Sequence, residues 1–141
     1  YAQNHFGVYR SDDGGDSWDA IESGLPSTFG FPMVVDPHRP DTIFTFPLQA
    51  DEDRMPPGGR CRVYRSRDAG TTWSALSAGL PQDPYHAAVL RDAMCTDDGD
   101  PAGIYFGTRL GEVYGSIDDG DSWTAVATHL PDVLTIRAFV P

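Results

Sequence analysis

The loop from residue 48 to 60 gathers acidic side chains that could take part in acid–base chemistry. Its sequence, LQADEDRMPPGGR, holds Asp51, Glu52, Asp53 and Arg54, together with two prolines that limit its freedom. A glycoside hydrolase uses two carboxyl groups as acid and base, so Asp51 and Asp53 are candidate catalytic residues and Arg54 is a candidate binding residue. The alternative is a solvated acidic loop tip, because runs of charge are usually exposed.

A second group of candidates comes from two later segments, Tyr85-His86 and Arg109 to Glu112. Tyr85 could serve as a glycosidase nucleophile, and His86 as a binding group or general base. Arg109 could hold a carboxylate through two nitrogen atoms, with Glu112 as a further binding residue. The alternatives are that Tyr85 and His86 are packed structural residues and that Arg109 simply pairs with Glu112.

The sequence shows no motif for other common kinds of reactive site. It has no Gly-rich phosphate loop, no His/Glu metal-ligand spacing and no Gly-x-Ser-x-Gly element. Cys61 and Cys95 stand 34 residues apart, without a second Cys or His at ligand spacing. We therefore expect no metal and no cofactor. The two cysteines form either one disulfide or two buried thiols.

Composition excludes several classes of partner. The 141 residues include 21 acidic and 10 basic side chains, for a net charge of −11. Such a chain repels nucleic acid and anionic membranes, and no apolar run approaches the ~18 residues of a membrane helix. Eighteen of the acids are Asp, and there are 15 Gly and 12 Pro, which indicates a turn-rich β protein. No leader is visible before Tyr1, which favours a cytoplasmic location.

A repeat organises the chain and positions the candidates. Three ungapped stretches, 8–26, 63–81 and 113–131, resemble one another, and the first matches each of the others at 11 of 19 positions. β-prone runs separated by an Asp/Pro turn precede the second and third copies. A full unit is therefore four short antiparallel strands in about 50 residues, which is typical of a propeller blade.

The predicted fold is all-β, with four-stranded antiparallel blades of a partial β-propeller forming one domain over residues 1–141. The expected parts are an outer half blade (1–30), two full blades (31–81 and 82–132) and a closing strand (133–141). A propeller needs about four or more blades to close. These two and a half blades therefore require either the remaining blades of the same chain or self-assembly into a ring.

The repeated turn has the form Ser-x-Asp-x-Gly-x-(Ser/Thr)-Trp. Its marker residues occur three times in register: Ser11, Asp13, Gly15, Trp18; Ser66, Asp68, Gly70, Trp73; and Ser116, Asp118, Gly120, Trp123. This pattern resembles the Asp-box, or bacterial neuraminidase repeat, of propellers that include sialidases, xyloglucan-active hydrolases, sortilin-type receptors and photosystem assembly factors. The resemblance implies a structural role for these twelve residues, on the face opposite the substrate site.

Strand alternation places the candidate residues at the end of the sheets opposite the Asp-box turns. The loops expected there span 24–31, 48–60, 79–86, 108–112 and 129–133. The resemblance implies that a sialidase would need three arginines, a Tyr/Glu pair and an acid, a set that this chain does not clearly supply. The favoured prediction is a sialidase-like propeller segment that binds a protein or glycan or acts as a scaffold. The alternative is an exo-sialidase-like glycoside hydrolase completed by further blades, so enzyme activity stays open.

Overall fold

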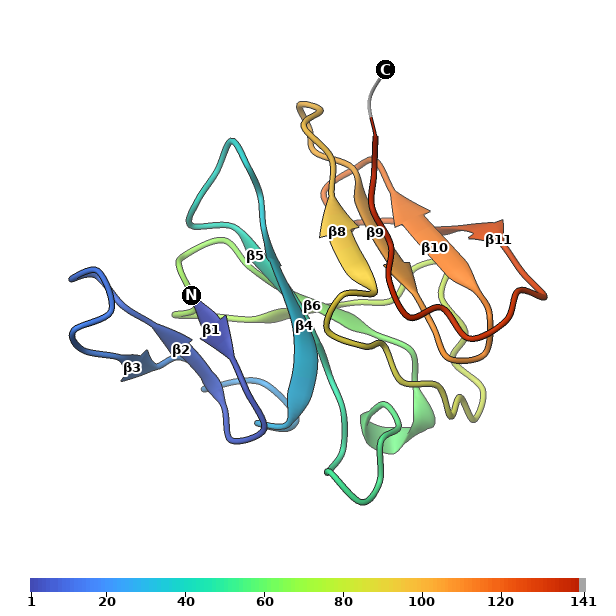
Figure 1. Cartoon of the computed structure of the whole chain (residues 1–141), viewed down its shortest axis with the longest axis horizontal. Helices are drawn as coiled ribbons and strands as arrows, with labels where there is room; N and C mark the ends of the chain where they lie inside the picture. The colour runs from blue at the N-terminus through green and yellow to red at the C-terminus, as the bar shows by residue number, and fades with distance from the viewer. Residues whose placement is uncertain (140–141) are drawn as a thin grey trace.

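The computed structural model describes residues 1–139 and confirms an all-β chain (Figure 1). Its strands form three antiparallel sheets, in which strands that follow one another along the chain are hydrogen-bonded neighbours. The only helical segment among these residues is the short 3₁₀ turn η1 (Pro57–Gly59). Three separate sheets side by side, rather than a closed barrel, are consistent with partial propeller blades.

The first sheet contains three strands, β1 (Ala2–Gln3), β2 (Val8–Arg10) and β3 (Asp19–Ala20). The sequence predicts only the outer half of a blade here, whereas the structure also forms β1. Two residues are too few for a periodic pattern, so this strand is visible only through its pairing with β2, in which Ala2 faces Tyr9 and Gln3 faces Val8. The sheet lacks one inner strand relative to the other two.

The second and third sheets each contain four strands in sequence order. The second is built from β4 (Gly30–Val35), β5 (Ile43–Pro47), β6 (Val63–Ser66) and β7 (Ser74–Leu76). The third is built from β8 (Met94–Thr96), β9 (Ile104–Gly107), β10 (Val113–Ser116) and β11 (Thr124–Ala127). The two innermost strands, β4 and β8, lie in contact. Short strands that meander outward from a central inner strand match the predicted blade pattern.

The hydrophobic core lies mainly between the second and third sheets. Phe44, Phe46 and Phe106 are fully buried, and the ring of Phe106 packs 5.2 Å from Trp123 and 5.3 Å from Tyr114, centroid to centroid. Burying an aromatic or large aliphatic side chain contributes roughly 1.5–3 kcal/mol, so this cluster is a major source of stability. It joins the two sheets and leaves their loop ends free to form a site.

The three box turns, residues 11–18, 66–73 and 116–123, share one hydrogen-bond pattern. In the first, Ser11 Oγ donates to Asp13 Oδ1 at 2.8 Å and accepts from the Gly15 N–H at 2.8 Å. The Asp13 carboxylate accepts from both the N–H and the hydroxyl of Ser17, at 2.9 and 2.6 Å. The second and third turns repeat these bonds, and each box glycine has a positive φ. Each turn is therefore held by its own side chains.

Neighbouring sheets make the same contact twice. A Cβ built on Gly70 would lie 2.5 Å from Ile21 Cδ1, and one on Gly120 would lie 2.7 Å from Leu76 Cδ1, so each box glycine packs onto the outer edge of the preceding sheet. At the first junction Trp73 Nε1 also donates to the Ile21 carbonyl at 2.8 Å, a bond that the buried Nε1 of Trp123 does not repeat at the second. These repeated contacts define a junction in which a box turn covers an apolar residue of the sheet before it.

The predicted closing strand does not form a ladder over residues 133–139. This segment runs beside the third sheet without strand pairing, and the Ile136 N–H donates to the Asp92 carbonyl at 2.9 Å (Figure 1). Within residues 1–139, none of the strands in the three sheets pairs with it. The last two residues of the prediction, 140 and 141, lie outside the described residues.

Two further features bear on function. Cys61 and Cys95 are both free thiols and both buried, so the structure contains no bridge between them. Within residues 1–139, no helix is long and apolar enough to cross a membrane.

Candidate functional site

The loops that carry the candidate residues meet at the end of the sheets opposite the box turns. The Tyr85 N–H donates to the Gly59 carbonyl at 2.8 Å, and the Leu130 N–H donates to the Gly111 carbonyl at 3.0 Å. At the other end, the box residue Ala69 donates its N–H to the carbonyl of Asp41 at 2.9 Å, in the turn between β4 and β5. Strand alternation thus sorted the connections correctly between the two ends.

A hollow of about 300 Å³ opens at this loop end. It is lined by Arg54, His86, Ala88, Arg109, Leu110 and Asp132. The structure therefore brings together three residues that the sequence singled out from separate loops: Arg54, His86 and Arg109. The lining offers guanidinium and imidazole donors, one carboxylate and two apolar side chains, which is a usual mixture for a small-ligand site.

Arg109 and Asp132 form the ion pair at the centre of this set. Arg109 Nε and Nη2 both donate to Asp132 Oδ2, at 3.0 and 2.9 Å. Both side chains are about half exposed, at 54% and 47%. An exposed ion pair contributes little to stability. The guanidinium N–H groups and the carboxylate oxygen that the pair does not use can still form hydrogen bonds with a ligand. The alternative pairing of Arg109 with Glu112 is wrong, because Asp132 takes the guanidinium and Glu112 lies elsewhere.

Arg54 and His86 are each held by a neighbour. Arg54 Nη2 donates to Asp51 Oδ1 at 2.5 Å, and its guanidinium lies 5.3 Å from the centre of the Phe31 ring. His86 Nδ1 lies 3.1 Å from the sulfur of Met55. A guanidinium held by a carboxylate and an aromatic ring loses little further freedom when it binds a ligand.

The two carboxylates proposed as an acid–base pair are both engaged within their own loop. Asp51 binds Arg54, whereas Asp53 Oδ2 accepts a hydrogen bond from Gln49 Nε2 at 2.8 Å. Neither residue lines the hollow. In this structure their visible role is to shape the 48–60 loop.

Tyr85, which is buried, and Glu112, which is partly buried, form a hydrogen-bonded pair. The Tyr85 hydroxyl donates to Glu112 Oε2, and Tyr85 is only 6% exposed. Burial raises the pKa of Tyr85 well above its usual value, and the bond to Glu112 raises it further. Burial and the nearby Glu112 charge likewise raise the pKa of Tyr114 to about 12. The pair therefore consists of a neutral phenol that donates to a carboxylate.

Sequence reasoning missed Asp132 and Leu110 as lining residues. Asp132 lies in the 129–133 loop, which was assigned to the correct face, but the sequence offered no reason to prefer it over its neighbours. Its partner Arg109 is 23 positions away, and such a pairing becomes visible only when β9, β10 and β11 are folded. Leu110 follows a candidate residue directly, and its exposure of 56% marks it as a surface apolar group.

The box carboxylates lie at the opposite end and are occupied by their own turns. Asp13, Asp68 and Asp118 each accept bonds from the Ser or Thr four residues later and from the Ser two residues before. In the described part of the chain, no three His, Cys, Asp or Glu residues gather in a way that could hold a metal ion. The geometry assigns these aspartates to turn structure.

Comparisons with known proteins find a distant similarity to a named enzyme. No family model matches the chain. Two curated sequences, both named xyloglucanase Xgh74A from Acetivibrio thermocellus, are each 29% identical to it over 124 aligned residues. The alignment covers 77% of this chain but only 14% of the relative, so the chain spans a small part of that protein's length. The similarity supports a distant relation to a glycoside-hydrolase-type β-propeller.

Proposed function

We propose that this chain is a segment of an Asp-box propeller that binds a glycan at its loop end, with a neutral polysaccharide of the xyloglucan type as ligand. The observation that carries the proposal is the hollow in which the Arg109–Asp132 pair lies beside Arg54 and His86. The relative's name, xyloglucanase, supports a glycan over a protein as the ligand. The whole protein's activity is part of the same proposal.

The lining suits a sugar for simple chemical reasons. Each sugar hydroxyl both donates and accepts, so it can accept from an Arg109 nitrogen while it donates to Asp132. The apolar face of a sugar ring can rest on Leu110 and Ala88 at the same site. A volume of about 300 Å³ is at the lower end of the range for ligand pockets, which fits one or two sugar units at a time.

The test is calorimetric titration of the folded chain with xyloglucan oligosaccharides. Replacing Arg109 with Ala, or Asp132 with Ala, removes charge-assisted hydrogen bonds and should weaken binding by about tenfold or more. The matched control is Arg10→Ala, which breaks an exposed Arg–Asp pair with Asp12 in the first box turn. If the oligosaccharides do not bind, or if both site variants bind like the wild type, the proposal is wrong.

A second candidate function is glycoside hydrolysis, and the Tyr85–Glu112 bond favours it. A tyrosine activated by a glutamate is the nucleophile implied by the resemblance to sialidases, and Tyr85 directly precedes His86, which lines the hollow. Tyr85 is buried, so attack on a sugar would require the adjoining loops to open.

Release of reducing sugar from xyloglucan, and of fluorophore from a sialoside, tests this second function. Activity on either substrate that falls at least about 100-fold in both Tyr85→Phe and Glu112→Gln would support it. If a protein of known oligomeric state binds the sugar without cleaving it, only the binding function remains supported.

A further inference from the structure

A polar hollow lies at the end of the sheets that carries the box turns, in the junction between the second and third sheets. Its volume is about 470 Å³, larger than that of the hollow at the loop end. The turn between β4 and β5, the start of the second box turn and the third box turn form its walls. The lining consists of Arg39, Pro40, Asp41, Thr42, Arg67 and Asp119.

Two arginines present hydrogen-bond donors to this hollow. Arg39 Nη2 and Arg67 Nη2 donate to different oxygens of the Asp119 carboxylate, at 3.0 and 2.8 Å. Arg39 also donates to Asp36 through Nε and Nη2, at 3.0 and 2.6 Å. Within residues 1–139 these bonds leave Nη1 of Arg39, and Nε and Nη1 of Arg67, without an acceptor. Both side chains stay about half exposed, so these nitrogens are available to a ligand.

Asp119 holds both guanidinium groups in place from the buried side of the hollow. Its side chain is only 11% exposed, and its backbone has a positive φ of 66°. The equivalent residue of the first box turn is Gly14, which adopts such a φ without strain. Asp119 accepts backbone strain at this position, and its carboxylate orients two donors that a glycine would leave unpaired. Donors that are oriented before a ligand arrives lose little freedom when it binds.

The charges of the lining favour a neutral ligand that is rich in hydroxyl groups. Arg39 and Arg67 are balanced by Asp41 and Asp119, and the whole chain carries a net charge of −11, so an anion gains little here. A hydroxyl group can accept from a guanidinium N–H while it donates to the Asp41 carboxylate. Pro40 adds an apolar ring on which the face of a sugar can rest. A neutral sugar combines these properties.

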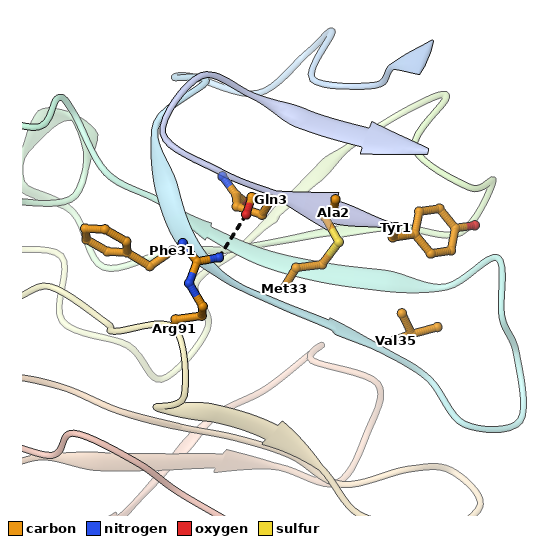
Figure 2. A pocket seen from close by; sticks show the side chains of 7 residues that line it. All are labelled: Tyr1, Ala2, Gln3, Phe31, Met33, Val35 and Arg91. Carbon is orange, nitrogen blue, oxygen red and sulfur yellow. Dashed lines mark hydrogen bonds between the residues drawn. The ribbon is translucent and has the colours of Figure 1, made fainter. Parts of the chain in front are cut away.

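The hollow drawn in Figure 2 lacks this combination of groups. It has a volume of about 360 Å³ and lies beside β1 and β4, and Arg91 is the charged side chain of its lining. Arg91 Nη1 already donates to the Gln3 carbonyl at 2.9 Å. The part of its lining that residues 1–139 supply contains no carboxylate to accept from a hydroxyl group, so that hollow is less suited to a sugar.

We propose that the hollow between Arg39 and Arg67 is a second glycan site, which takes a neutral sugar unit. It goes beyond the site proposed at the loop end, because the two linings share no residue and lie at opposite ends of the sheets. A chain with both sites binds two oligosaccharides at once and can hold two polysaccharide strands together.

The experiment is titration of the isotope-labelled chain with xyloglucan oligosaccharides up to about 10 mM, followed by amide NMR, which reports on each end separately. The amide signals of Thr42 and Asp119 should shift as the second site fills, and that of Leu110 as the loop-end site fills. Arg67→Ala, at a side chain that is 55% exposed, should weaken the box-end response by about tenfold or more and leave the Leu110 response unchanged. Arg109→Ala should do the reverse.

Arg10→Ala is the matched control, because it removes an exposed arginine paired with Asp12 in the first box turn and should leave both responses intact. A Leu110 response without a Thr42 response overturns the second site and keeps the loop-end proposal, whereas the opposite result overturns only the latter. A Thr42 response that survives in Arg67→Ala also overturns the second site. So does a Thr42 response to sodium sulfate that the oligosaccharides do not produce, because the hollow would then bind anions.

Discussion

Arg65 joins the second sheet to the box turn of the third through a single nitrogen. Its Nη1 donates to the Asp119 carbonyl at 2.5 Å and to Asp121 Oδ1 at 2.8 Å, and its side chain is only 9% exposed. Arg39 and Arg67 donate to the Asp119 carboxylate from the same side, at 3.0 and 2.8 Å. The carboxylate at position 119 therefore faces three guanidinium groups from the neighbouring sheet.

We expect Asp119→Ala to lower the free energy of unfolding by roughly 2 kcal/mol. The substitution removes a mostly buried carboxylate that accepts hydrogen bonds from Arg39 and Arg67, whereas Arg65 keeps its bonds to the backbone carbonyl of residue 119 and to Asp121. Urea denaturation followed by tryptophan fluorescence measures the change. Asp12→Ala breaks the exposed pair with Arg10 and should cost no more than about 1 kcal/mol. Equal losses in the two variants would contradict a special role for Asp119.

Gly79 and Gly14 provide a matched pair for separating crowding from backbone strain. Both have a positive φ, at +86° and +75°, but a Cβ on Gly79 would lie 2.0 Å from the carbonyl oxygen of Trp123, whereas Gly14 has nothing within 4 Å. Gly14→Ala should cost only the left-handed strain, roughly 1–2 kcal/mol. Gly79→Ala should cost at least about 2 kcal/mol more, because backbone must move. Similar melting temperatures for the two variants would refute this packing.

The box aspartates should make the fold sensitive to acid. Hydrogen bonds from the Ser17 hydroxyl, the Ser17 N–H and Ser11 lower the pKa of Asp13 to about 2, and the equivalent bonds lower the pKa of Asp68 and Asp118. Because the pKa in the folded state lies below that of the unfolded chain, these carboxylates stabilise the fold above about pH 4. That contribution is lost as the pH falls toward 2.

Thermal melts between pH 7 and 2 measure this dependence. Asp13→Asn should melt lower than the wild type at neutral pH and should lose less on acidification, because it cannot be protonated. Asp16→Asn removes the same charge from the same turn without removing the acceptor of these bonds. The melting temperature of this control variant should therefore change with pH as steeply as that of the wild type. An unchanged slope in Asp13→Asn would rule out the proposed linkage.

The two thiols should be unreactive until the chain unfolds. Cys61 is fully buried and Cys95 nearly so, and burial raises the pKa of both thiols, so little thiolate is available. Reaction with a disulfide reagent at pH 8 should be at least about 100-fold slower in buffer than in guanidinium. Rapid modification of either cysteine in the native protein would show that its surroundings open far more readily than the structure implies.

The parts of this fold that sequence could reveal are those held by local bonds. The hydrogen bonds made by the Ser and Asp side chains of a box turn lie within seven residues, so the spacing of Ser66, Asp68 and Gly70 predicts the turn directly. The blade pattern follows from the three copies of that turn and the β-prone runs between them. The alternating direction of successive strands also allows each loop to be assigned to one end of the sheets from the sequence alone.

The pairings that build the site depend on folding and could not be predicted individually. Tyr85 and Glu112 are 27 residues apart and Arg109 and Asp132 are 23 apart, so each meets its partner only through sheet geometry. The first strand of the third sheet, β8, starts only at Met94, well inside the blade range of 82–132 that the sequence predicts. The residues before β8 form backbone hydrogen bonds outside a regular ladder. For example, the Arg109 N–H donates to the Ala88 carbonyl.

The repeated contact of a box glycine with the sheet before it makes the arc behave as a one-dimensional chain of coupled units. Gly70 touches Ile21 and Gly120 touches Leu76, and the interaction of each sheet is with the next one along the sequence. Stability in such a system is the sum of unit terms and nearest-neighbour terms. Amide hydrogen exchange should then be slowest in β5 and β6, which have a sheet on either side, and should accelerate outward to β3 and β11.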